Sequence, residues 1–116
     1  MTYLADYQGK VYSDTITIAS SGTVSGALDL AGRALVGFLL PATFTGTAIT
    51  FQVSVDGTTY TAVYNTSNAV LSVTVTQGRV YALAPTDLLC SRYIKLVSGT
   101  TENGARSIIC YSRELA

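Results

Sequence analysis

Histidine is absent from this sequence, and so is tryptophan. Histidine is the commonest general base and metal ligand in proteins, and it activates the nucleophile in Ser-His and Cys-His sites. Its absence excludes those catalytic arrangements. Tryptophan offers the largest aromatic surface for stacking, so a sugar-binding site in this chain would have to rely on other rings.

Charged residues are also scarce, at 12% of the 116 residues, with seven basic and seven acidic side chains. A soluble globular domain usually carries about 25%. The net charge of zero provides no strong field that would attract nucleic acid or an anionic membrane surface. The longest apolar run, residues 34–42, is far shorter than the roughly 20 residues of a membrane-spanning helix. We therefore expect neither nucleic acid nor a membrane as a partner.

The first residues lack the basic and apolar segments of a secretory signal peptide. We expect the chain to be made and folded in a cytoplasm, where cysteines usually stay reduced. Cys90 and Cys110 are accordingly predicted to be free thiols, and two cysteines are too few for a structural zinc site. Cys110 shares a strand face with Ile108, which predicts a small buried residue.

The acidic residues show no spacing that would pair two of them for acid–base catalysis. Most lie at predicted turns or strand ends, where solvated carboxylates are common. We expect no catalytic residue, no metal and no cofactor. The acids considered are Asp6, Asp14, Asp29, Asp56, Asp87 and Glu102.

The chain is rich in Thr, Ser, Gly, Val and Tyr, which favour strands and turns. Strand-like segments recur at the regular spacing of a sandwich or barrel, and only Pro85–Leu89 has the pattern of a brief helical turn. We predict an all-β fold: a single jelly-roll-like β-sandwich of eight or nine short antiparallel strands over residues 14–116, after an N-terminal arm over residues 1–13. The predicted strands are 14–19, 24–30, 34–40, 49–55, 59–65, 71–76, 80–83, 92–97 and 106–113.

Two of these segments allow side chains to be oriented. Residues 34–40 are continuously apolar, which predicts a strand covered on both faces. Asp56-Gly57 lies between two alternating runs and predicts a hairpin with a two-residue loop, or a four-residue loop of the same parity. In that register Val53 faces Tyr60, so Tyr60 and Tyr64 are predicted to lie on the inward, core face.

Eight tyrosines are many for a chain of this length. Tyrosine is a good strand residue, but it also anchors interfaces and can stack on sugars. Tyrosines in the arm would leave apolar surface exposed unless a partner covered it, and Tyr93 shares an outward face with Lys95. The candidate partner-interface residues are Tyr3, Leu4, Tyr7, Tyr12 and Tyr93.

Residues 46–60, GTAITFQVSVDGTTY, and residues 92–99, RYIKLVSG, carry a resemblance to known proteins. They resemble small bacteriophage and prophage virion proteins of β-sandwich type, including capsid decoration (cement) proteins and other head or tail components. The resemblance implies no enzyme activity, no cofactor and many identical copies on a particle. The same segments are similar to discoidin-type galactose-binding sandwiches, although Tyr60 stands where those domains usually have tryptophan and their terminal cysteine pairing has no counterpart.

We therefore expect a non-enzymatic virion protein, made in the host cytoplasm, that decorates and stabilises a capsid shell. The low charge and the mean hydropathy of +0.37 favour self-association, with a trimer as the commonest local symmetry of a shell. The expected partners are further copies of the chain and the major capsid protein or another virion protein. The alternatives are a carbohydrate-binding sandwich module and a tail or head-fibre component.

Overall fold

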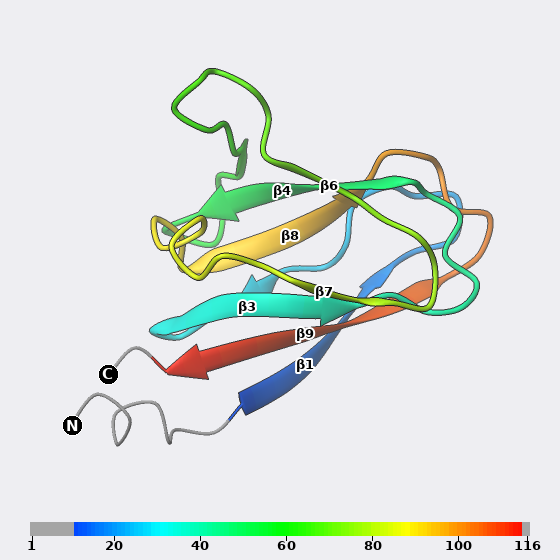
Figure 1. Cartoon of the computed structure of the whole chain (residues 1–116), viewed down its shortest axis with the longest axis horizontal. Helices are drawn as coiled ribbons and strands as arrows, with labels where there is room; N and C mark the ends of the chain where they lie inside the picture. Colours follow the sequence, from blue (N-terminus) through cyan, green and yellow to red (C-terminus); the bar gives the residue numbers. More distant parts are fainter. Residues whose placement is uncertain (1–10, 115–116) are drawn as a thin grey trace.

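The computed structural model describes residues 11–114 and forms a two-layered β-sandwich (Figure 1). Within this range there is no helix, and so no helix that could cross a membrane. The predicted all-β sandwich is confirmed. Its nine strands are β1 (Val11–Ile18), β2 (Leu28–Asp29), β3 (Arg33–Leu39), β4 (Ala48–Ser54), β5 (Thr61–Ala62), β6 (Ser72–Thr74), β7 (Val80–Ala82), β8 (Tyr93–Ser98) and β9 (Arg106–Glu114).

The strand order is that of a jelly roll. The first sheet has the order β1-β9-β3-β7, and the second has the order β2-β8-β4-β5, with β6 also pairing with β4. If β5 and β6 count as one interrupted strand, eight strands pass between the two sheets in the jelly-roll order, with every pairing antiparallel.

The core fills the space between the sheets with aliphatic and aromatic side chains from alternate strand positions. Phe38 of β3 meets Phe51 of β4 edge-on, with 6.3 Å between ring centroids, and so joins the two layers. Leu88 also enters the core from the segment predicted to be a helical turn, which forms successive hydrogen-bonded turns. Cys110 is buried beside Ile108, as predicted.

A β-bulge explains the continuous apolar run of β3. The register with β9 shifts between Leu35 and Gly37. Leu35 and Phe38 are three residues apart, yet both lie in the core because the extra residue, Val36, reverses the alternation. The strand lies between β9 and β7, and its outward Leu39 is only half-buried.

Strand β1 begins earlier than the alternation at Asp14 indicated. Residues 11–13 pair with residues 111–113 of β9, so they belong to the sandwich. Tyr12 therefore lies in a strand and not in an arm. The other arm candidates, Tyr3, Leu4 and Tyr7, lie outside the described residues.

The predicted register of the hairpin after β4 is wrong by one residue. Val53 pairs with Thr61 and not with Tyr60. A shift of one residue moves every side chain to the opposite face. Tyr60 and Tyr64 consequently point outward, Tyr64 with 60% of its surface exposed, while Val63 takes the core position.

Side-chain hydrogen bonds set the length of this loop. The Ser54 hydroxyl accepts hydrogen bonds from the amides of Asp56 and Gly57, and one Asp56 carboxylate oxygen accepts from the amides of Thr58 and Thr59. These bonds form a turn wider than two residues. Seven residues lie between the paired Val53 and Thr61, which is an odd number. The predicted loops required an even number, so the register differs by one residue.

A short hairpin interrupts the strand formed by β5 and β6. Gln52 pairs with Ala62 and Thr50 pairs with Ser72, so eight extra residues are inserted opposite β4. Exposed Tyr64 and Val70 face each other across this hairpin. Its tip is closed by the Asn65 side chain, which accepts hydrogen bonds from the amides of residues 67 and 69.

Candidate functional site

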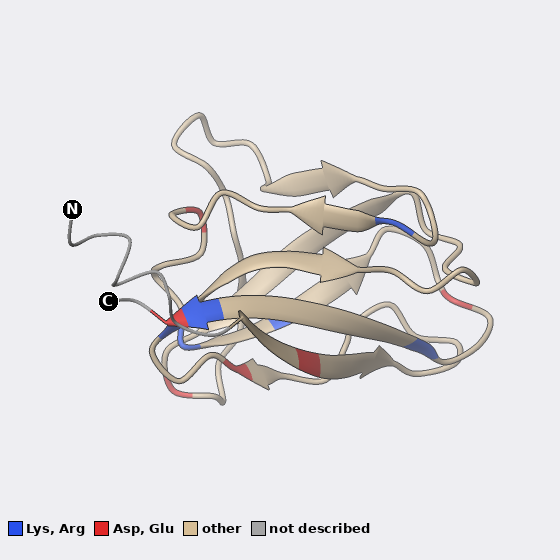
Figure 2. Ribbon diagram, turned by 60° about the horizontal axis from the view of Figure 1, so that its bottom comes forward, with Lys and Arg blue, Asp and Glu red and all other residues tan. Residues whose placement is uncertain are grey.

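Most charged residues among residues 11–114 lie toward the end of the sandwich where β1 begins and β9 ends (Figure 2). This charged end includes Asp29 and Arg33 around the β2–β3 turn, Arg92 before β8 and Asp56 in the β4–β5 loop. The long sides of the sandwich carry few charges (Figure 2). The charged end is therefore the part of the described surface best suited to polar contacts.

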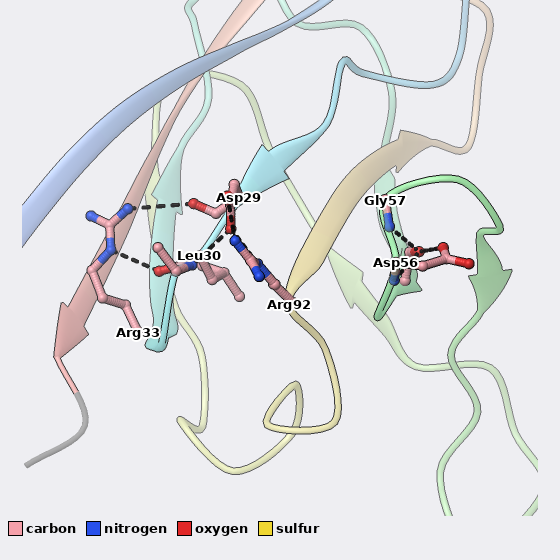
Figure 3. Close-up of polar contacts among 8 residues, drawn as sticks. Asp29, Leu30, Arg33, Asp56, Gly57 and Arg92 are labelled. Carbon is pink, nitrogen blue, oxygen red and sulfur yellow. Dashed lines mark hydrogen bonds and ion pairs between the residues drawn. The ribbon is translucent and has the colours of Figure 1, made fainter.

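Asp29 is the central acid of the charged end (Figure 3). Arg92 donates two hydrogen bonds to its carboxylate, at 3.2 and 3.4 Å, and the Ala31 amide donates a third at 2.9 Å. The hydrogen bond from Arg92 lowers the pKa of Asp29, so the pair stays ionised. Arg33 donates to the carbonyls of Asp29 and Leu30 and fixes the turn from the other side. About half of each ionic side chain is exposed, so the Asp29–Arg92 pair orders this surface more than it stabilises the fold.

A shallow groove of about 580 Å³ runs beside this turn. The guanidinium of Arg33 lies 4.4 Å from the centre of the Tyr12 ring and 3.5 Å from a carboxylate oxygen of Asp14. The Tyr12 hydroxyl donates a hydrogen bond to Glu114, which raises the pKa of the phenol. Tyr12 was predicted to contact a partner; in the structure it contacts Arg33 and Glu114 of the same chain. The groove is lined by Tyr12, Asp14, Ala31, Gly32, Arg33 and Glu114.

The outer side of the second sheet carries an aromatic and cationic cluster. Lys95 lies 4.3 Å from the centre of the Tyr60 ring, and Gln52 pairs with Lys95 on the neighbouring strand. The Tyr93 ring packs over Gly57, where a Cβ atom would come within 3.2 Å of it. Tyr93 shares the face with Lys95, as predicted. We call Tyr60, Tyr93, Lys95 and Gln52 the tyrosine face; Tyr60 was missed as a member because the predicted register turned it inward.

A second hollow, of about 290 Å³, lies next to exposed Cys90. Asp56 lines it, but amide hydrogen bonds from Thr59 and Thr58 and a hydroxyl hydrogen bond from Ser54 lower the pKa of Asp56 to about 2. Such a carboxylate stays ionised near neutral pH and is poorly suited to donate a proton. Its hydrogen bonds with Ser54, Thr58 and Thr59 hold the loop in shape.

Glu102, the most completely buried acid among residues 11–114, lies at the opposite end of the sandwich. Its carboxylate accepts hydrogen bonds from the amides of Thr45 and Gly46, from the Ser98 hydroxyl and from Arg106, at 2.8 to 3.0 Å. Burial alone would raise the pKa of Glu102, but these hydrogen bonds outweigh it and lower the pKa to about 2.

Glu102 also ties a further loop through its backbone. Its carbonyl accepts from the Ser21 amide, and its own amide donates to the Gly22 carbonyl. It therefore fastens together the β1–β2, β3–β4 and β8–β9 loops. From the sequence, Glu102 was considered only as one of the acids without a second acid beside it. The spacing of four residues between Glu102 and Arg106 was the one signal of an ion pair.

No three His, Cys, Asp or Glu side chains among residues 11–114 gather closely enough to hold a metal ion. Both cysteines are free, and burial raises the pKa of Cys110 to about 12, which suppresses the reactive thiolate. A scan against models of protein families, a search of curated proteins and a search of solved structures each found no match to this chain.

Proposed function

We propose that this protein is a non-enzymatic structural component of a bacteriophage virion, most simply a decoration protein that stabilises the capsid shell. The observation that carries the proposal is the uneven distribution of charge over residues 11–114, with few charges on the long sides and most of them at the end where β1 begins (Figure 2). Sides with few charges suit contact with neighbouring proteins in an assembly. The jelly-roll order adds support by analogy, because viral capsid proteins use it, as do lectins.

Stabilisation in this proposal comes from repetition. A domain of this size offers interfaces of modest area, each of which is weak alone. Many copies bound to one shell act together, and their summed interfaces raise the resistance of the shell to rupture. The charged end and Tyr93 contact the shell, together with Tyr3, Leu4 and Tyr7, while the long sides with few charges contact further copies.

Counting copies by quantitative mass spectrometry of purified virions tests this function. The particles are those of the phage or prophage that encodes the chain, and the major capsid protein serves as the internal standard. Several hundred copies per particle support a shell decoration protein. A few copies or about a dozen indicate a tail, vertex or head-fibre component, and absence from purified particles refutes a virion role.

The tyrosine face supports a second candidate function, carbohydrate binding. Two phenol rings, an ammonium and an amide lie on one open sheet surface, and sugars bind by stacking on rings and by hydrogen bonding to such groups. In this alternative the isolated protein binds members of a glycan array. Tyr60→Ala should abolish that binding, whereas Tyr64→Ala, an exposed tyrosine outside the face, should leave it intact; a blank array removes the candidate.

A further inference from the structure

The outer face of the first sheet is unusual for a sandwich because its centre is aliphatic. In the observed register Thr15 pairs with Ile109, Ile109 with Leu39, and Leu39 with Val80, so these four outward side chains form one row across all four strands. Val80 is 60% exposed. The solvent-facing side of an antiparallel sheet normally carries polar residues. This row instead exposes apolar side chains to water.

The neighbouring row is also uncharged. Ser13, Tyr111, Gly37 and Ala82 lie side by side in it, again from β1, β9, β3 and β7. Among the described residues, the charged side chain at the outward positions of these strands is Arg113, at one end of the face. We define the two rows together as the sheet-one face.

We propose that the sheet-one face binds the same face of a second copy of this chain, about a two-fold axis. The inference rests on the proposed multi-copy assembly and names the surface that makes it. A face without charge offers no ion pair to a charged partner. Two copies of such a face can meet without like-charge repulsion, and the zero net charge of the chain adds no repulsion between copies at long range.

Shape also favours stacking of two such faces. Large residues, Leu39 and Val80, lie next to small ones, Gly37 and Ala82, which gives ridges and hollows that can interdigitate. Packed sheets lie roughly 10 Å apart with their strands about 30° from parallel. Two copies would thus form a sandwich of four layers.

The available area matches a weak, specific dimer. The four strands average about seven residues of ~3.4 Å and lie about 4.8 Å apart, so the sheet covers roughly 450 Å² per copy before side-chain relief is added. Two copies bury about 1,000 Å² in total, which is the lower bound for a specific interface. We expect a dimer that forms at micromolar concentrations, and its two-fold axis replaces the trimer expected from the sequence.

Sedimentation velocity on the full chain between about 1 and 500 μM tests the proposal. The wild type should shift from monomer to dimer within that range. Val80→Lys and Thr15→Lys place a charge at exposed positions of the row, and each should raise the dissociation constant at least tenfold. Ser72→Lys places the same charge on an exposed position of the second sheet and should leave the constant unchanged. Thermal melts should show that all three variants fold.

Each outcome separates this inference from the proposed function. A wild type that stays monomeric at 500 μM, or a dimer weakened equally by Ser72→Lys, overturns the sheet-one dimer. If such a protein is still present in hundreds of copies per virion, the virion role stands without this interface. A dimer that Val80→Lys disrupts in a protein absent from virions supports the interface and refutes the virion role.

Discussion

Replacing Glu102 with glutamine should be among the most damaging single changes in this sandwich. The carboxylate is 0% exposed and accepts hydrogen bonds from four different residues. A glutamine side chain keeps one oxygen but presents an NH₂ group where the other oxygen accepted, so at least two donors lose their acceptor. It also leaves the guanidinium of Arg106, which is 9% exposed, without its ionic partner.

The magnitude follows from these contacts. A hydrogen bond to a charged group contributes about 1.5–3 kcal/mol, and breaking a buried ion pair by removing one partner costs about 3–5 kcal/mol. These contributions overlap, so we expect Glu102→Gln to lower the free energy of unfolding by about 3–5 kcal/mol. That is a large part of the roughly 5–15 kcal/mol of a typical domain, and it corresponds to a fall in Tm of roughly 10–20 °C.

Urea unfolding followed by far-UV circular dichroism measures this loss. The midpoint should fall while the slope of free energy against urea stays constant, which shows that the native fold is retained. Asp87→Asn is the matched control, because it removes a carboxylate from an exposed position. A loss below about 1 kcal/mol, or one equal to that of the control, would refute the assigned role of Glu102.

The same carboxylate gives a pH dependence of defined sign. The pKa of Glu102 in the folded protein is about 2, below its ordinary value of 4.5. The unfolded chain therefore binds this proton more readily, and the stabilisation, complete above about pH 5, is lost as the pH falls toward 2. Glu102→Gln has no such group, so the stability difference between wild type and variant should shrink over that window.

Three further predictions concern other parts of the chain. Deleting residues 1–10 should leave the Tm of the monomer nearly unchanged but weaken binding to the particle; equal binding by particle pull-down, or an unfolded product, contradicts this. Under native conditions iodoacetamide should label Cys90 alone, because Cys110 is buried, and intact mass should show a second group only after denaturation. Gly57→Ala should lower the free energy of unfolding by about 2 kcal/mol or more in chemical denaturation, because Gly57 has a φ of 81° and an added Cβ would also meet the Tyr93 ring. Gly32→Ala, where φ is 83° but the space is open, should lower it by about 1 kcal/mol. Equal losses for the two variants would show that the contact with the Tyr93 ring is unimportant.

The sequence predicted best the strands that lie between two others. Residues 93–98 and 106–113 alternate strictly, and β8 and β9 each have a partner strand on both sides, so one face of each had to be buried. The register after β4 could not be predicted from Asp56-Gly57. The loop length depends on which amides the side chains of Ser54 and Asp56 bind, and that choice overrides the preference of the dipeptide for a tight turn.

The buried acid was hidden from sequence patterns for a different reason. Thr45 and Gly46, which donate to Glu102, are 57 and 56 residues away in the chain, and only the jelly-roll topology brings the loops together. The tyrosine face was half predicted. Tyr93 was placed correctly by the alternation of its own strand, whereas Tyr60 depended on a long-range register.

The hairpin that interrupts the strand opposite β4 is a suitable insertion site for foreign peptides. The chain leaves the sheet at Val63 and returns at Leu71, whose amide donates to the Val63 carbonyl at 2.9 Å, so the two ends are already joined. Each doubling of loop length between such fixed ends costs only about 0.6 kcal/mol. An epitope or enzyme tag grafted in place of residues 65–68 would therefore project from the surface without changing the register of either flanking strand.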